Sequence, residues 1–137
     1  PAEKMSLRET LMRKGVGADS RIDFTKLFFD GALETPMLPE NAGDLFLPLE
    51  MVRLAPSAVN RQPWRAVRCG NLVHFYEKKN RGMATGTWDV QKIDMGIALC
   101  HFELGAAESG LRTEFVMEDP GLTDDPGCVY TASFRIG

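Results

Sequence analysis

The amino-acid sequence predicts an α+β fold, in which helices pack on a mostly antiparallel sheet around a long central buried helix. The first observation is the segment Asp89–Ser109, whose apolar residues recur at the three- and four-residue steps of a helix. The second is a pair of strand-like segments, Trp64–Cys69 and Leu72–Tyr76, separated only by the turn pair Gly70-Asn71. The order of helices, hairpin, long helix and two final strands favours α+β over alternating βαβ units. With 137 residues, the chain is expected to form a single domain over 1–137.

Two short helices are predicted near the start of the chain. Ser6 and Glu9 have the spacing of a capping box, in which each side chain bonds the other residue's backbone. A first helix should therefore run to about Lys14. Asp23 is placed to cap a second helix that runs through Phe29.

A third helix should follow a loop. The segment Glu34–Gly43 holds two prolines and an asparagine, which is typical of a loop. Asp44 then opens the helix and Pro56 ends it, so that Ser57–Pro63 becomes a second loop. The apolar side chains of this helix recur at helical spacing: Leu45, Phe46, Leu49 and Val52.

The long helix over Asp89–Ser109 is expected to lie in the centre of the fold, because apolar residues surround it. Its main apolar stripe consists of Val90, Ile93, Ile97, Cys100, Leu104 and Ala107. Three further residues, Met95, Leu99 and Phe102, widen the apolar face.

Two strands complete the predicted sheet. Leu111–Met117 is strand-like, and an acidic turn, Glu118–Asp125, leads to the last strand, Cys128–Ile136. Alternation along a strand sends successive side chains to opposite faces. This rule groups Cys128, Tyr130, Ala132, Phe134 and Ile136 on one face of the last strand.

Charge and composition exclude several classes of function. The net charge of −3 offers no basic field to attract nucleic acid or an anionic membrane. The longest near-continuous apolar run, Met95–Cys100, is far too short to cross a bilayer. The 3 cysteines form no CxxC pair, and His74 and His101 have no partners at ligand spacing, so no metal site is expected. No signal-peptide pattern opens the sequence, and we expect free thiols in a reducing cytoplasm.

The segment Ala55–Trp64 is the densest local signal in the chain. Its two prolines fix the backbone, and the small residues between them allow a flat ligand to approach closely. Ser57, Asn60 and Gln62 supply both hydrogen-bond donors and acceptors, which suit the edge of a heteroaromatic ring. The residues alone leave a second interpretation open, a helix-to-strand connector with turn residues and a packed Trp64.

This string resembles the P-S-x-x-N-x-Q-P-W segment of the nitroreductase family, at the family's own spacing. Three other segments, Leu49–Leu54, His74–Tyr76 and Ile93–Ala98, are similar to the subgroup of that family whose chain is internally duplicated. The resemblance spans nearly the whole chain and best matches the C-terminal half of that subgroup. It therefore implies a nitroreductase-like domain that forms the C-terminal portion of a longer family protein.

The resemblance also implies FMN as the cofactor, bound between two halves of the protein. The implied flavin contacts are Pro56, Ser57, Ala58 and Asn60, supported by Gln62 and Trp64. Family members hold the FMN phosphate with an R-x-S-x-R segment near their start, and Ser6 and Arg8 have a similar spacing here. A capped surface helix with solvated charges is the alternative interpretation of Ser6 and Arg8.

The function implied by the resemblance is that of an FMN-dependent oxidoreductase, which reduces nitroaromatic- or quinone-like acceptors with NAD(P)H. The flavin carries the redox chemistry in such enzymes, so no catalytic acid or base is expected. Because the family's site lies between two halves, we expect a homodimer, or pairing with an upstream half. A flavin-fold binding or assembly module without turnover is the alternative.

The remaining candidate residues are weaker. Asp94, near the start of the long helix, is interpreted as an acid that compensates the helix dipole. Arg135 on the last strand is a minor phosphate candidate, since such arginines are usually solvated. Asn60 lies between small residues, so its amide is expected to face outward and to matter to the flavin rather than to the fold.

Overall fold

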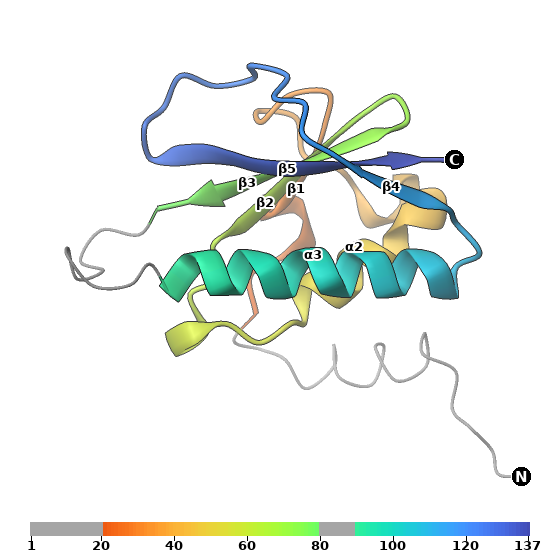
Figure 1. Ribbon diagram of the computed structural model, residues 1–137, viewed down its shortest axis with the longest axis horizontal. Helices are drawn as coiled ribbons and strands as arrows, with labels where there is room; N and C mark the ends of the chain where they lie inside the picture. The colour runs from red at the N-terminus through yellow and green to blue at the C-terminus, as the bar shows by residue number, and fades with distance from the viewer. Residues whose placement is uncertain (1–20, 80–89) are drawn as a thin grey trace, which may run out of the picture.

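The computed structural model describes residues 21–79 and 90–137, and it shows two helices on one face of a five-stranded sheet (Figure 1). The strands follow the order β1-β2-β3-β5-β4, and every neighbouring pair is antiparallel except β1 with β2. The strands are β1 (Phe28–Asp30), β2 (Trp64–Cys69), β3 (Leu72–Lys78), β4 (Thr113–Val116) and β5 (Cys128–Ile136). The predicted α+β class with a mostly antiparallel sheet is confirmed. The predicted first helix, with Ser6 and Arg8, lies outside the described residues.

The predicted hairpin is present as β2 and β3, in the expected register. Cys69 pairs with Leu72, so that only Gly70 and Asn71 form the turn. Gly70 has a φ of 60°, in the left-handed region that glycine adopts without steric cost.

The segment after Asp23 does not form the predicted helix through Phe29. Asp23 does act as a cap, since its carboxylate accepts a hydrogen bond from the backbone N–H of Thr25. The capped element is only a 3₁₀ turn, Phe24–Lys26, and the chain then extends into β1. Phe28 is fully buried and pairs in parallel with Ala66 of β2, so a tertiary contact overrides the local helical signal.

The third helix is confirmed as α2 (Phe46–Arg53), but Asp44 does not cap it. Asp44 lies inside a preceding 3₁₀ turn, Gly43–Leu45, and no side chain caps the N-terminus of α2. Pro48 is the third residue of the helix, where its missing N–H breaks no intrahelical hydrogen bond.

The long helix is confirmed as α3 (Val90–Glu108), but it turns a different face to the sheet than the sequence predicted. Its buried residues are Gln91, Asp94, Met95, Ala98, Phe102, Gly105 and Ala106. Ile93 and Leu104 of the predicted stripe face away, and they are 62% and 56% exposed. The correction has a packing reason, because small residues allow α3 to approach its neighbours closely. A Cβ on Gly105 would lie 2.6 Å from the Cα of Pro48 in α2.

A β-bulge in β5 also corrects the predicted alternation. Phe75 of β3 pairs with Ala132, but the next residue, Tyr76, pairs with Tyr130, which leaves Thr131 as the extra residue. Tyr130 and Ala132 therefore lie on opposite faces of the sheet. Ala132 belongs to the buried side chains, whereas the Tyr130 hydroxyl lies 2.6 Å from the Ser133 hydroxyl on the other face.

The hydrophobic core lies between the sheet and the two helices. Its largest fully buried side chains include Phe28, Trp64, Phe75, Phe102 and Phe134. The sheet face opposite α2 and α3, called the outer face here, is covered by loops rather than helices, including the segment between β4 and β5 (Figure 1). None of the helices in the described ranges is long and apolar enough to cross a membrane.

Candidate functional site

The loop Ala55–Trp64 connects α2 to β2 and lies against the N-terminal part of α3, as the yellow-green segment below that helix shows (Figure 1). A 3₁₀ turn, Ala58–Asn60, forms its centre. Asn60 and Gln62 both adopt positive φ angles, 55° and 52°. Asparagine tolerates this region better than most residues, whereas glutamine is uncommon there, so other contacts must hold this backbone in place.

Asp94 supplies the first of these contacts from the second turn of α3. Its two carboxylate oxygens accept hydrogen bonds from the backbone N–H of Ala58, at 3.1 and 3.2 Å. Burial raises the pKa of Asp94, and the hydrogen bond from Ala58 opposes that rise. Asp94 therefore anchors the loop and is too far along α3 to be chiefly an acid that compensates the helix dipole. Its position on the buried face of α3 is visible only in the structure, because the sequence predicted a different buried stripe.

Ser57 and Gln62 close the loop on itself. The Ser57 hydroxyl accepts a hydrogen bond of 2.9 Å from the backbone N–H of Gln62. The Gln62 side chain is only 2% exposed, and its Oε1 accepts from the backbone N–H of Ile22 at 2.7 Å. Its Nε2 donates to the backbone oxygen of Asn60 at 3.0 Å. Gln62 thus shapes the loop from inside, and a direct cofactor contact by Gln62 stays a prediction.

Asn60 is exposed and also carries structural contacts. Its Oδ1 accepts from Nη1 of Arg21 and from Nε2 of Gln62, each at 3.1 Å. The side chain of Asn60 therefore helps to hold the loop, and its expected contact with a flavin stays a prediction.

Arg21 is a residue of this site that the sequence did not reveal. Besides its bond to Asn60, its Nη2 donates to the backbone oxygen of Leu54 at 3.3 Å. Its Nε is buried and has no hydrogen-bond partner within the part of the chain that the structure describes. No local pattern could have placed it here, because Arg21 and Asn60 are 39 residues apart.

These residues bring together a donor set that fits a flat, partly anionic heteroaromatic group. Pro56 and Asn60 are exposed, and Ser57 and Ala58 are half-buried, so the predicted contacts lie near one surface. Arg21 adds a positive charge at the same place. Trp64 is fully buried in the core at the end of the loop, and its predicted role in supporting a flavin site stays a prediction. Three hollows formed by the described residues are lined by other segments.

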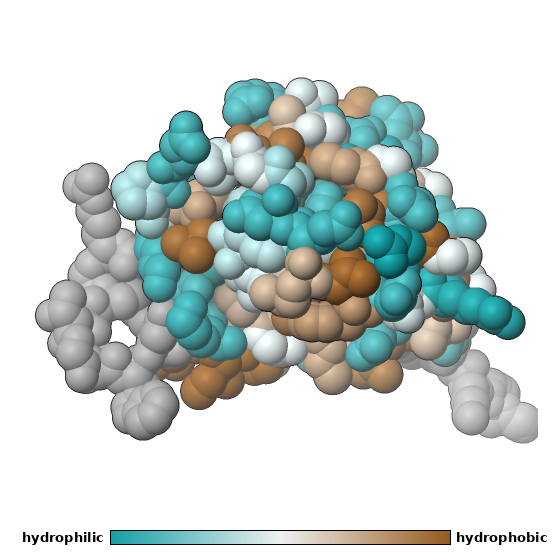
Figure 2. Space-filling view, turned by 45° about the horizontal axis from the view of Figure 1, so that its top comes forward, coloured by the Kyte–Doolittle hydropathy of each residue, from teal (hydrophilic) through white to brown (hydrophobic). Residues whose placement is uncertain are grey.

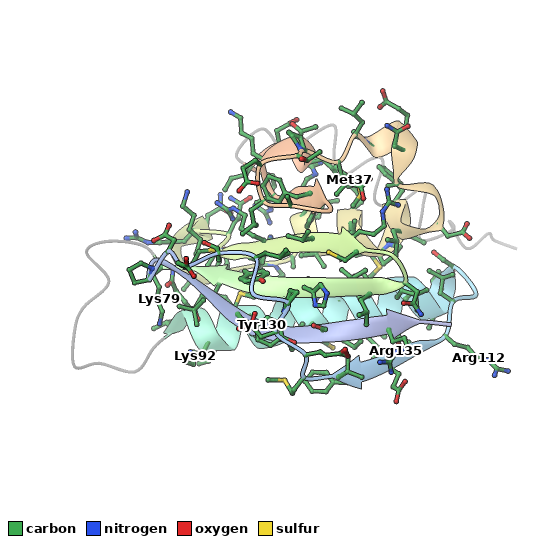
Figure 3. The ribbon with its side chains drawn as sticks, turned by 90° about the horizontal axis from the view of Figure 1, so that it is seen from above. Met37, Lys79, Lys92, Arg112, Tyr130 and Arg135 are labelled. Carbon is green, nitrogen blue, oxygen red and sulfur yellow. The ribbon has the colours of Figure 1, made fainter. Side chains whose placement is uncertain are left out.

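The other candidates do not join this cluster. Ser6 and Arg8 lie outside the described residues. Arg135 pairs with Glu114 at 2.8 Å and with Glu118 at 3.3 Å, so its charge is already neutralised (Figure 3). Across 21–79 and 90–137, no group of three His, Cys, Asp or Glu side chains is placed to hold a metal ion.

Fold and loop together define a nitroreductase-like domain, and comparison with known families agrees. Residues 33–106, more than half of the chain, match the family model described as "Putative TM nitroreductase". The chain belongs to this family. None of the curated proteins compared matches the chain.

Three solved structures share the fold. A "putative nitroreductase" from Thermotoga maritima MSB8 is 25% identical with a TM-score of 0.50, and the match covers 85% of this chain and 41% of that one. A nitroreductase family protein from Clostridium novyi NT is 16% identical with a TM-score of 0.58, covering 97% and 84% of the two chains. An oxidoreductase containing FMN is 18% identical with a TM-score of 0.53, covering 88% and 78%. The chain thus spans less than half the length of the Thermotoga protein.

Proposed function

We propose that this chain forms half of the flavin site of an FMN-dependent oxidoreductase, which reduces nitroaromatic- or quinone-like acceptors with NAD(P)H. The observation that carries the proposal is the loop Ala55–Trp64, held in one conformation by Asp94, Ser57 and Gln62. Membership of the nitroreductase family supports it. So does the fold shared with an oxidoreductase that contains FMN.

The loop is suited to bind a ligand because its conformation is fixed before the ligand arrives. Backbone groups that would otherwise move are tied to α3 through Asp94 and to the segment before β1 through Gln62. Such preorganisation reduces the entropy lost on binding. The exposed residues Pro56 and Asn60 are then presented on a stable surface.

Electrostatics at the loop favour an anionic group. Arg21 is tied to Asn60 and to the Leu54 carbonyl, and no carboxylate pairs with it among the described residues. Its positive charge would attract the phosphate or the electron-rich edge of FMN. When bound, FMN supplies the redox chemistry by accepting a hydride and passing electrons to the acceptor. The chain's own residues then bind and orient, without a catalytic acid or base.

The proposal requires a second half, supplied either by a second copy of this chain or by an upstream half of a longer protein. The chain spans 41% of the Thermotoga protein, which supports a site completed by another half. The exposed apolar stripe of α3 offers the surface, since Val90, Ile93 and Leu104 are 36%, 62% and 56% exposed. Contiguous apolar surface of this kind usually marks an interface. A two-fold pair of chains would cover it on both copies.

Titration of FMN against the purified chain tests the proposal, with quenching of flavin fluorescence as the readout. We expect saturable quenching and a yellow protein after gel filtration. Asp94→Ala, which releases the loop, should weaken the quenching, and Asp44→Ala, an exposed acid in another segment, should not. A folded protein that stays colourless at high FMN concentration would contradict the proposal and favour a binding or assembly module without turnover.

Light scattering coupled to size exclusion tests the dimer separately. We expect twice the chain mass at tens of micromolar protein. The double variant Ile93→Lys with Leu104→Lys should be monomeric, whereas Leu38→Lys, an equally apolar exposed site away from α3, should remain dimeric. A monomeric wild-type chain would refute the pairing.

A further inference from the structure

A separate hollow opens on the outer face of the sheet, where β2 and β5 begin and β3 ends. Its volume is about 520 Å³. Apolar side chains line part of it, from Ile22, Phe29 and Leu33. Figure 2, which brings the outer face forward, shows a mixed surface in which small hydrophobic patches lie between hydrophilic side chains.

The hollow opens on the outer face of the sheet, and it adjoins the loop Ala55–Trp64 at Gln62, which bonds the lining residues Ile22 and Arg65. Arg65 lines the hollow, and its neighbours Trp64 and Ala66 point into the core on the helix side. Lys78 also lines it, and the preceding Glu77 lies 3.4 Å from Lys92 of α3. Because side chains alternate along a strand, Arg65 and Lys78 project from the outer face. None of the residues of the loop Ala55–Trp64 lines the hollow, so the two surfaces are neighbours with different linings.

Arg65 lines the hollow with N–H donors that the described residues do not use. Its Nη1 donates to the backbone oxygens of Gln62 and Trp64, at 2.9 and 2.7 Å. Within the described ranges its Nε and Nη2 have no partner, and no carboxylate pairs with it. Burial lowers the pKa of Arg65. A partly desolvated guanidinium without a counterion is unfavourable, and an oxyanion that accepts from its free N–H groups would offset this cost.

The remaining polar lining makes the hollow cationic, although the chain carries a net charge of −3. Lys26 and Lys78 join Arg65, and no carboxylate lies within ion-pair distance of either lysine among the described residues. Asp125 is the acidic residue of the lining, and its Oδ1 accepts from the backbone N–H of Gly127 at 2.8 Å. Cys128 contributes a neutral thiol, because burial and Asp125 raise its pKa against the opposing effect of Arg65 and Lys78.

We propose that this outer hollow binds a small organic anion. Arg65 and Lys78 hold its oxyanion group, and Phe29 and Leu33 contact its apolar body. A guanidinium with free N–H donors suits a carboxylate or a phosphate, since both present two oxygens in one plane. The volume admits an aromatic acid.

Alkylation of Cys128 provides the test, because its thiol lines the hollow and a bound anion would shield it. The 137-residue chain is treated with iodoacetamide, and the modification of each cysteine is followed by peptide mass spectrometry. We expect benzoate and phenyl phosphate to slow the reaction of Cys128 but not of Cys69 or Cys100, which line no part of the hollow. The more effective of the two identifies the preferred oxyanion. No protection by either, or equal protection by chloride or by benzyl alcohol, would overturn the proposal.

Substitutions of single residues distinguish binding in the hollow from a general effect of added salt on the alkylation. Arg65→Ala should raise the benzoate concentration needed for protection at least about tenfold, the effect of losing a charge-assisted hydrogen bond. Lys78→Ala, whose exposed side chain makes no contact needed for folding, gives a second measure if Arg65→Ala does not fold. Arg112→Ala is the matched control, since Arg112 points into solvent at the far end of the molecule (Figure 3). An equal loss in Arg112→Ala would also overturn the proposal. The test needs no flavin, so its result is independent of the proposed function.

Discussion

Both carboxylate oxygens of Asp94 accept from the backbone N–H of Ala58, which ties α3 to the centre of the loop Ala55–Trp64. The side chain of Asp94 is 3% exposed, so this bond forms away from solvent. The loop that we propose to contact the flavin therefore takes its position from a helix that follows it by more than thirty residues. A substitution at Asp94 should therefore alter the conformation of the proposed flavin-contacting loop, although Asp94 itself would not contact the flavin.

We expect Asp94→Ala to destabilise the fold by about 1–3 kcal/mol, because it leaves the N–H of Ala58 without its acceptor. Urea unfolding followed by circular dichroism measures the change. Asp94→Asn keeps an oxygen acceptor and should recover most of the loss. If both variants lose equally, the charge rather than the hydrogen bond holds the loop.

The same residue should give a defined pH dependence. Because burial raises the pKa of Asp94, the carboxyl ionises less readily in the folded chain than in the unfolded one. Its contribution to stability is complete below the unfolded pKa and is lost as the pH rises through the folded pKa. Asp94→Asn, which cannot ionise, should therefore gain stability relative to the wild type as the pH rises from about 4 towards 7. A constant difference between the two proteins over that range would contradict the assignment.

His74 should give a pH dependence of stability opposite to that of Asp94, with stability lost as the pH falls. Burial lowers its pKa, against the attraction of Glu118 and Asp119, and its Nδ1 lies 2.6 Å from the Ser133 hydroxyl. The unfolded chain therefore binds the proton more readily, and stability present above the unfolded pKa is lost as the pH falls through the folded value. The wild type should weaken between about pH 7 and pH 5, and His74→Gln should weaken less. Parallel urea curves for the two proteins would show that another group titrates.

Asn60 offers a test of backbone conformation. Asn60→Ala should destabilise the chain without FMN by about 1–2 kcal/mol, since alanine is strained at a φ of 55°. Asn60→Gly removes the same side chain but relieves the strain. The difference in stability between the two variants therefore measures the cost of backbone strain at this position. Thermal unfolding is the measurement, and equal melting temperatures would show that the loop adapts.

The contact between α2 and α3 should tolerate no extra methyl group. Gly105→Ala would place a Cβ 2.6 Å from the Cα of Pro48, so the helices must separate, at a cost of about 1–3 kcal/mol. Gly96→Ala is the matched control on the same helix, where a Cβ meets nothing within 4 Å. It should stabilise the chain by about 0.5–1 kcal/mol through helix propensity. A stable Gly105→Ala variant would mean that the two helices are not in close contact.

The elements with strong local signals were predictable from the sequence. The β2–β3 hairpin follows from Gly70 and Asn71, and β5 spans the predicted Cys128–Ile136. The sequence could not show which face of α3 is buried, because more than one stripe has helical spacing and the surfaces that α3 packs against choose between them. The sequence also could not show the β-bulge at Thr131, because the bulge depends on how β5 pairs with β3.

The candidate loop was visible in the sequence, but its supports were only partly so. Ser57, Asn60 and Gln62 stand in one short segment, and their polarity suggested ligand contacts. The structure gives them contacts to each other and to Arg21, a residue remote in the chain. Polar residues in a short segment indicate where a site lies. Which of them hold the loop and which face a ligand depends on residues that are remote in the sequence.

The parallel strand β1 is joined to β2 by a long connection. A two-residue turn links β2 to β3, whereas the chain between β1 and β2 includes α2, as the crossover of a parallel pair requires. The backbone N–H of Ala66 donates to Leu27 at 3.0 Å, and that of Gly31 donates to Arg68 at 2.8 Å, so β1 covers one edge of β2. The three residues of β1 therefore cover an edge of β2 that could otherwise pair with a strand of another molecule.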